Sequence, residues 1–335
     1  MIMKITDTQN GSRKLAGNRP FLSTRDTGGV QARGISRAEA LSDRNRSQHQ
    51  ELEAVRHEYA KVQQALYEAA QVQRRLCSPR ELVWGEYEVA GEIFPVRHLS
   101  GDFFKVLQLG DVLGLALGDI AGKGLSAGIW QAHVMDLLQR CSRTYFHPTE
   151  VVGAVNRELC LNQSEPPITA LFFARLDPER NELVYCNAGL PAPLLLRRNK
   201  LVERLDEGGP MLGALQQATY RSGSVYLDPG DMLLAYSDGL TECRNPQDEE
   251  FEIGRLSAAA ESVSGATANQ VLFSTLATVL DFADSCPPGD DLSLLVIRRC
   301  AVGLTERTSE RSKNISVPRS RSRSTVRPRQ VTNSG

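Results

Sequence analysis

The sequence predicts an α+β fold in which antiparallel sheets stack on one another and helices lie on the outside. Between Trp84 and Arg299, short apolar or alternating runs are separated by turn residues, a pattern typical of strands. Neighbouring runs are joined by tight turns such as 109–111 and 178–181. Such turns are too short for the crossover that parallel strands need, so the pairing is expected to be antiparallel.

Each element of this region is predicted from its apolar period and its turn signals. The expected strands are 87–93, 102–109, 112–119, 170–177, 182–188, 193–197, 222–227, 232–237 and 292–298. The expected helices are 126–140, 149–161, 255–262 and 267–283.

A long helix is expected before the sheets. Residues 1–34 are rich in Gly, Asn, Ser, Thr and Arg and predict a disordered arm. Residues 35–78 predict a helical linker that Pro79 ends, because apolar residues recur at spacings of three and four at Leu52, Val55, Tyr59, Val62, Leu66 and Ala69, with Gln73 at the next position. This narrow stripe favours a coiled coil that joins two copies in a homodimer, and packing on the following domain is the alternative.

Composition excludes several classes of protein. Of the 335 residues, 41% are hydrophobic and 24% are charged, and the net charge of −1 gives no general attraction to nucleic acid. Seven irregularly spaced cysteines argue against a disulfide framework, and no signal peptide or membrane-spanning run is apparent, so we expect a cytoplasmic protein. Residues 301–335 form a basic Ser/Arg-rich tail that is expected to be disordered and to offer at most weak contact with nucleic acid.

Four expected strands each bring an aspartate to one of their ends, beside glycine in every case. Asp119 follows the apolar run 112–117, Asp102 opens another strand, Asp238 follows 232–237, and Asp290 and Asp291 precede 292–297. A P-loop does not fit residues 117–124, because three residues instead of four separate Gly118 from Gly122 and Gly124 occupies the Ser/Thr position.

Each aspartate alone could cap a helix or a turn. Together they indicate a carboxylate cluster that cations neutralise, and oxygen ligands select Mg²⁺ or Mn²⁺. Two such ions about 4 Å apart are the arrangement that activates water for attack on a phosphoryl group.

These motifs resemble a known family. The segments 100–104 (SGDFF), 118–124 (GDIAGKG), 187–193 (NAGLPAP), 230–242 (GDMLLAYSDGLTE) and 290–294 (DDLSL) are similar to those of the bacterial PPM-type, or PP2C-like, serine/threonine phosphatases of the SpoIIE/RsbU type, over residues 70–299. Ser100, Lys105 and Leu190 depart from that family's commonest residues at their positions.

The resemblance implies an αββα sandwich over residues 80–300 with two Mn²⁺ or Mg²⁺ ions. Asp119 would bridge the ions beside the backbone carbonyl of Ile120. The rest of the ligand set would comprise Asp102, directly or through water, together with Asp238 and Asp290, and Asp291 is the weaker candidate of its pair. Arg97 and Lys123 are candidates for binding substrate, or are ordinary surface charges.

The function that the resemblance implies is hydrolysis of phosphoserine or phosphothreonine on a regulatory protein. Family members act in partner-switching pathways, where the substrate is often an anti-sigma-factor antagonist. A non-catalytic binding scaffold with the same fold is the alternative, and a nucleic-acid-associated protein that acts through the Arg/Ser tail is a third reading.

Overall fold

The structure is a computed structural model that describes residues 27–122, 124–161 and 166–300. The chain divides into two compact units, residues 1–63 and residues 64–335. The described part of the first unit is helical and belongs to α1 (Thr27–Leu76), whose last residues lie in the second unit. All other helices and strands belong to the second unit.

Helix α1 begins earlier than the sequence predicts. We expected a disordered arm up to residue 34, but the helix starts at Thr27 and includes three glycines at 28, 29 and 34. Glycine in a helix costs about 1 kcal/mol relative to alanine, which is why this stretch was interpreted as an arm. Residues 1–26 of the expected arm, and the expected tail over 301–335, lie outside the described residues.

Two antiparallel sheets form the second unit. The six-stranded sheet has the order β1 (Glu81–Trp84), β2 (Tyr87–Phe94), β11 (Leu292–Arg299), β10 (Met232–Tyr236), β7 (Leu194–Leu196) and β8 (Val202–Arg204). The five-stranded sheet has the order β3 (Phe103–Leu109), β4 (Val112–Ile120), β5 (Thr169–Asp177), β6 (Glu182–Ala188) and β9 (Gly223–Tyr226).

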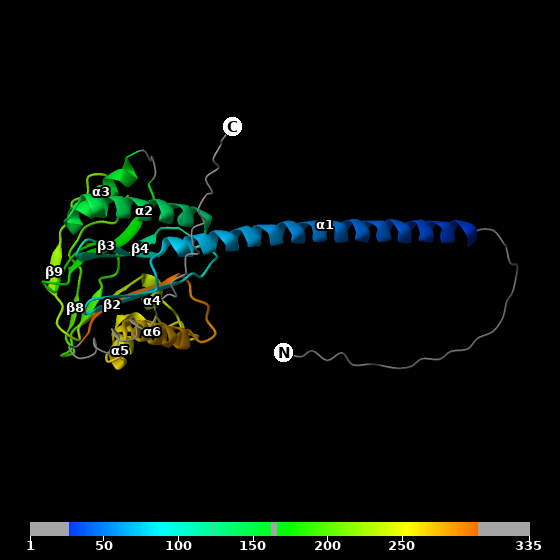
Figure 1. Cartoon of the computed structure of the whole chain (residues 1–335). Coiled ribbons are helices and arrows are strands. Elements are labelled where there is room, and N and C mark those ends of the chain that lie inside the picture. Colours follow the sequence, from blue (N-terminus) through cyan, green and yellow to red (C-terminus); the bar gives the residue numbers. More distant parts are fainter. Residues whose placement is uncertain (1–26, 123, 162–165, 301–335) are drawn as a thin grey trace, which may run out of the picture. The chain divides into compact units, whose positions relative to one another are not determined.

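Helices cover the outer face of each sheet, as Figure 1 shows. Helices α2 (Leu125–Thr144) and α3 (Pro148–Cys160) pack on the five-stranded sheet, and α5 (Glu252–Ser262) and α6 (Ala268–Ala283) pack on the six-stranded sheet. The one-turn helix α4 (Asp238–Thr241) follows β10. The predicted αββα sandwich is therefore confirmed.

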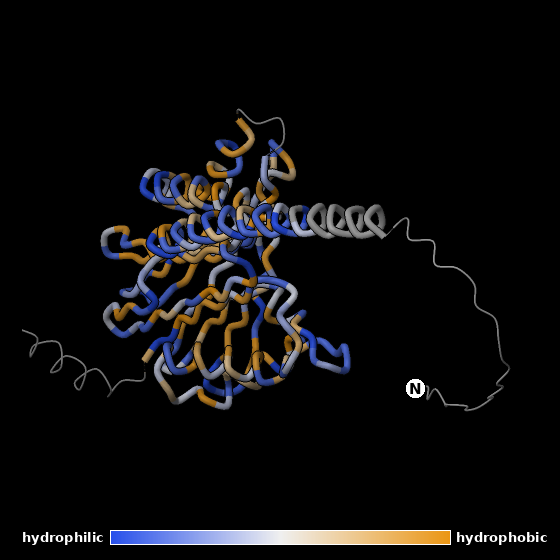
Figure 2. The backbone as a smooth tube through the Cα atoms, turned by 90° about the vertical axis from the view of Figure 1, so that its right-hand side faces the viewer, coloured by the Kyte–Doolittle hydropathy of each residue, from blue (hydrophilic) through white to orange (hydrophobic). Residues whose placement is uncertain are grey.

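Three apolar layers hold this sandwich together. One lies between the two sheets, and each of the others lies between a sheet and its helices. In Figure 2 the strands are accordingly mostly hydrophobic, and the helices carry hydrophilic residues along their length. Burial on both faces explains why strands such as β10, with five buried residues in succession, read as continuous apolar runs.

Three short elements were missed by the sequence prediction. Strand β1 has four residues and β8 has three, and neither is long enough to show a clear alternation. Helix α4 is a single turn, which is too short for a helical period. All seven cysteines are free thiols in the structure. None of the described helices has the length and apolar character needed to span a membrane.

Candidate active site

The pairing of β3 with β4 brings the first two aspartates together. Phe103 is the register partner of Gly118, so Asp102, one residue earlier, lies opposite Asp119. The carboxyl groups of Asp102 and Asp119 form a hydrogen bond with each other. Asp102 is only 3% exposed, whereas Asp119 is partly exposed.

The six-stranded sheet supplies the other aspartates. Tyr236 at the end of β10 pairs with Leu294 near the start of β11, so the residues just beyond these positions are also neighbours. Gly239 lies so close to the other segment that a Cβ there would be 2.2 Å from the carbonyl oxygen of Asp291. Asp238 is therefore next to the 290–291 pair at one end of the sheet.

A serine connects the two halves of this site. The Ser293 hydroxyl, fully buried at the start of β11, donates a hydrogen bond to the carboxylate of Asp102. The Ser293 N–H group donates to the hydroxyl of Ser237, 3.1 Å away. The ends of β3, β4, β10 and β11 thus meet at one end of the sandwich, and Asp102, Asp119, Asp238 and Asp290 lie there.

The aspartates influence one another electrostatically. Burial, and next the neighbouring charge of Asp119, hold the pKa of the Asp102 carboxyl well above its usual range. Burial also raises the pKa of Asp119, and the charges of Asp238, Asp290 and Asp291 act in the same direction. Clustered carboxylates of this kind either take up protons or bind a cation.

The two adjacent aspartates have different roles in the structure. Asp291 is 8% exposed, and its carboxylate accepts hydrogen bonds from the N–H of Val96 at 2.8 Å, the hydroxyl of Ser100 at 2.6 Å and the N–H of Gly101 at 3.2 Å. Asp290 is exposed, and its Oδ1 accepts a hydrogen bond from the N–H of Asp291. Asp291 therefore fixes the 96–101 loop, which leaves Asp290 as the better candidate for a ligand.

The donor atoms fit a hard divalent cation. A Cβ at Gly101 would lie 2.6 Å from the carbonyl oxygen of Ile120 and 3.6 Å from Asp119 Oδ1, so these two oxygens border one small space that only glycine leaves open. All these donors are oxygens, which Mg²⁺ and Mn²⁺ prefer. In the part of the chain that the structure describes, no three acidic, histidine or cysteine side chains already form a closed metal-binding group.

Gln73 is a site residue that the sequence prediction missed. Its side chain is buried on an otherwise exposed part of α1, and its amide bonds both the carbonyl and the N–H of Ser100, at 2.7 and 3.1 Å. The Ser100 hydroxyl in turn accepts a hydrogen bond from the N–H of Asp102 at 2.9 Å. A glutamine on the apolar seam of the helix was the signal that could have identified this contact.

Of the two candidate substrate-binding residues, Arg97 and Lys123, the structure describes only Arg97. Arg97 is exposed in the loop that Asp291 holds, directly after Val96, and its side chain forms no hydrogen bond or ion pair with the described residues. This position is next to the aspartate cluster. Lys123 lies outside the described residues, between Gly122 and Gly124, both of which have positive φ angles of 111° and 82°.

The model of the family described as Stage II sporulation protein E (SpoIIE) matches residues 110–300, which is more than half of the chain. The chain belongs to the SpoIIE family. The match covers Asp119, Asp238 and Asp290, and the motif at 100–104 lies just before it. This SpoIIE-family domain is of the PP2C type, and the chain is a protein serine/threonine phosphatase by family.

Individual relatives agree with this assignment. The phosphoserine phosphatase RsbU of Bacillus subtilis is 24% identical over 255 residues, which are 75% of this chain and 74% of RsbU. The PP2C domain of SiaA from Pseudomonas aeruginosa superposes with a TM-score of 0.64 at 18% identity, covering 71% of this chain and 97% of that domain.

A third relative shares the fold. A structure of RsbX in complex with magnesium superposes on the SpoIIE-family domain with a TM-score of 0.50 at 14% identity, covering 65% of this chain and 97% of RsbX. PP2C-type phosphatases use divalent metal ions. The oxygen-rich end of the sandwich is the part of this chain whose chemistry fits such ions.

Proposed function

We propose that this chain hydrolyses phosphoserine or phosphothreonine on a regulatory protein, using two Mn²⁺ or Mg²⁺ ions held at the aspartate cluster. The observation that supports this most is the meeting of Asp102, Asp119, Asp238 and Asp290 at one end of the sandwich.

The acidic residues would hold the metal ions, and the basic residues would bind the substrate phosphate. Asp119, central to the cluster, would be shared by both ions, with the Ile120 carbonyl beside it. Asp238 and Asp290 would complete the ligand set, and Asp102 would bind directly or through water. Divalent ions at such a site supply an activated water molecule and neutralise charge on the phosphoryl group. Arg97, exposed beside the cluster, and Lys123 would bind the phosphate of the substrate.

The substrate would be a small phosphoprotein of a partner-switching pathway. Similarity to RsbU, a phosphoserine phosphatase, supports this class of substrate. The open end of the sandwich, where Asp290 and Arg97 are exposed, suits a phosphorylated side chain presented on a protein surface. The competing hypothesis is a non-catalytic scaffold with the same fold. Measuring whether the protein turns over a phosphorylated substrate decides between the two.

The test is phosphate release from a phosphoserine peptide with and without Mn²⁺. Wild-type protein should require the ion, and Asp119→Asn should lose activity by at least about a thousandfold, because it removes the shared ligand. Asp111→Asn, at the exposed β3–β4 turn beyond the far end of β4, is the matched control and should keep full activity. Equal activity in Asp119→Asn and wild type would refute the mechanism, and no activity in wild type with either ion would favour the scaffold.

We also propose that α1 joins two copies of the chain as a coiled coil. The stripe residues Leu52, Val55, Tyr59 and Val62 are 46 to 65% exposed in the single chain, so they are available to a second helix. The double variant Val55→Lys/Val62→Lys should shift the mass measured by light scattering from dimer to monomer. Arg56→Lys on another face of α1 is the control, and a monomeric wild-type protein would contradict this proposal.

A further inference from the structure

A second concave site lies at the opposite end of the six-stranded sheet from the aspartates. Its cavity of about 620 Å³ is bordered by the β7–β8 turn, the start of β10, the end of β11 and the end of α5. Leu196, Met232 and Arg298 form its floor, because they are register partners on neighbouring strands and so lie on the same face of the sheet. This volume falls in the range of about 300–1,000 Å³ typical of small-molecule sites.

The floor contains a cation with an unsatisfied donor. Arg298 is only 5% exposed, yet its Nε atom has no hydrogen-bond partner among the described residues. Its Nη1 atom lies 3.8 Å from Glu88 Oε2, which is beyond hydrogen-bond range, and that oxygen already accepts a hydrogen bond from the N–H of Ala268. Arg298 lines the cavity, and its buried positive charge has only this long ion pair among the described residues, so an anion in the cavity would stabilise it electrostatically.

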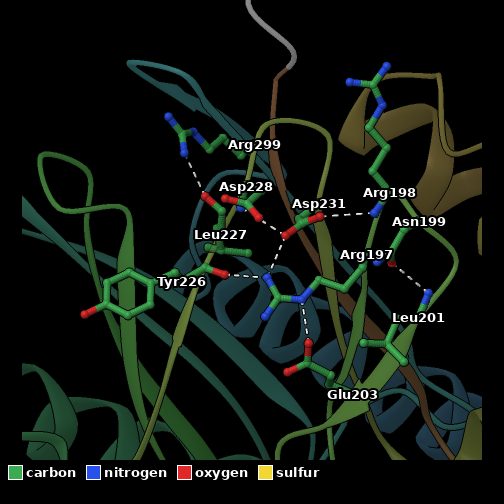
Figure 3. A network of polar contacts seen from close by, with 10 residues as sticks. All are labelled: Arg197, Arg198, Asn199, Leu201, Glu203, Tyr226, Leu227, Asp228, Asp231 and Arg299. Carbon is green, nitrogen blue, oxygen red and sulfur yellow. Dashed lines mark hydrogen bonds and ion pairs between the residues drawn. The ribbon is translucent and has the colours of Figure 1, made fainter.

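Two further cations, Arg198 and Lys200, lie at the rim of the cavity on the β7–β8 turn, which several hydrogen bonds hold in place. Arg197 is tied to Asp231 at 2.7 Å and to Glu203 at 2.6 Å, and the backbone N–H of Arg198 donates to the other oxygen of Asp231 at 3.1 Å. Figure 3 shows this network and the Arg198 guanidinium extending away from it. Arg198 and Lys200 are exposed, and their side chains have no ionic partner in the described chain.

The lining as a whole favours an anion that carries an organic part. Ser264 adds a hydroxyl group to the lining, while Leu196 and Met232 offer an apolar surface. Glu261 is the single acidic residue among the lining residues, against four basic ones. Guanidinium groups bind phosphate oxygens in pairs, and a lysine adds a mobile point charge.

We propose that this cavity binds a small organic phosphate of about the size of a mononucleotide. Its phosphate would lie among Arg198, Lys200 and Arg298, and its organic part would lie against Leu196 and Met232. The site is separate from the aspartate cluster and does not depend on the proposed phosphatase function. A small phosphorylated molecule could thus bind this domain without competing for its metal ions.

The experiment is calorimetric titration of the full chain in EDTA with AMP, glucose 6-phosphate, adenosine and inorganic phosphate. At least one of the two organic phosphates should bind saturably, and more tightly than inorganic phosphate, while adenosine should not bind. Arg198→Gln/Lys200→Gln should weaken that binding by about tenfold or more, since two charged contacts are lost. Ser264→Glu, which places a negative charge at the exposed rim, should weaken it as well.

Two controls make the result decisive. Arg221→Gln removes an exposed arginine that does not line the cavity and should leave binding unchanged. Asp119→Asn should also leave binding in the cavity unchanged. If the organic phosphate bound at the aspartate cluster instead, that variant would alter its affinity. Failure of both organic phosphates to bind, equal binding of adenosine, or full binding by Arg198→Gln/Lys200→Gln and Ser264→Glu would overturn the proposal.

Discussion

The side-chain amide of Gln73 holds both backbone groups of Ser100, with Nε2 donating to the carbonyl oxygen at 2.7 Å and Oε1 accepting from the N–H at 3.1 Å. This contact connects the last turn of α1 to the loop that precedes Asp102. Because the Ser100 hydroxyl also bonds the carboxylate of Asp291, the loop is held from two sides. The position of Asp102 therefore depends on a residue of the helix.

Replacing Gln73 with alanine should disturb both stability and the site. Two buried backbone groups of Ser100 would lose their partners, so we expect the free energy of unfolding to fall by about 2 kcal/mol. Mn²⁺ should also bind more weakly, because Asp102 loses its support. Urea unfolding and a Mn²⁺ titration measure the two effects.

The matched control is Gln64→Ala on the same helix. Gln64 is exposed and bonds only Glu68 on α1, so its loss should change neither quantity appreciably. If Gln73→Ala behaved like Gln64→Ala in both measurements, the contact with Ser100 would not be what positions Asp102.

Asp102→Asn should separate stability from function. Burial and the charge of Asp119 raise the pKa of Asp102, so the negative charge on this carboxyl is unfavourable in the metal-free fold. An asparagine can still accept from Ser293 and donate to Asp119. In EDTA at neutral pH we expect the free energy of unfolding to rise by on the order of 1 kcal/mol, with phosphatase activity strongly reduced.

The pH dependence of this effect has a defined sign. A carboxyl group whose pKa is raised on folding binds more protons in the folded state, so metal-free wild type should lose stability as pH rises above the ordinary pKa of an aspartate. Asp102→Asn should show a weaker loss over that range. Thermal unfolding at pH 5 and at pH 8 measures it, and parallel curves for the two proteins would contradict the electrostatic explanation.

Asp290 and Asp291 should respond differently to the same substitution. Asp291→Asn weakens three hydrogen bonds that hold the 96–101 loop and should destabilise the fold by about 2–3 kcal/mol. Asp290→Asn should change the unfolding free energy little and reduce the affinity for Mn²⁺. The opposite pattern, with Asp290→Asn unfolding the protein and Asp291→Asn losing only metal, would exchange the two roles.

Gly101 should not tolerate a side chain. A Cβ there would lie 2.6 Å from the Ile120 carbonyl oxygen, so Gly101→Ala must move one of the two segments of the site, and we expect a destabilisation of about 1–3 kcal/mol with loss of activity. Gly254 lies in α5, and a Cβ added there would meet no neighbouring atom of the described residues within 4 Å. Gly254→Ala should therefore leave the free energy of unfolding unchanged or raise it. Circular dichroism melts and peptide dephosphorylation check both variants.

The strands and the aspartates of the site could be predicted because their signals are local. An apolar run that ends in an aspartate beside a glycine, as at Asp119 and Asp238, marks both the strand and its end within about ten residues of sequence. The resemblance to a family then supplied the order in which these segments combine. The short strands β1 and β8 gave no such signal, because their pairing is decided by the neighbouring strand.

The partners of Ser100 could not be predicted in the same way. Its contacts with Gln73 and Asp291 join segments far apart in the chain, and they exist only after helix and sheets have packed. Likewise, the sequence does not say which of two adjacent aspartates turns inward. The structure shows it, because the donors that select Asp291 come from the loop at 96–101.

The most direct test of the proposed metal centre is the anomalous diffraction of crystals of this protein grown with Mn²⁺. Two manganese peaks about 4 Å apart, with Asp119 between them and Asp238 and Asp290 in contact, are the expected result. Density for manganese elsewhere on the protein, or none at the ends of β4 and β10 under saturating Mn²⁺, would contradict it.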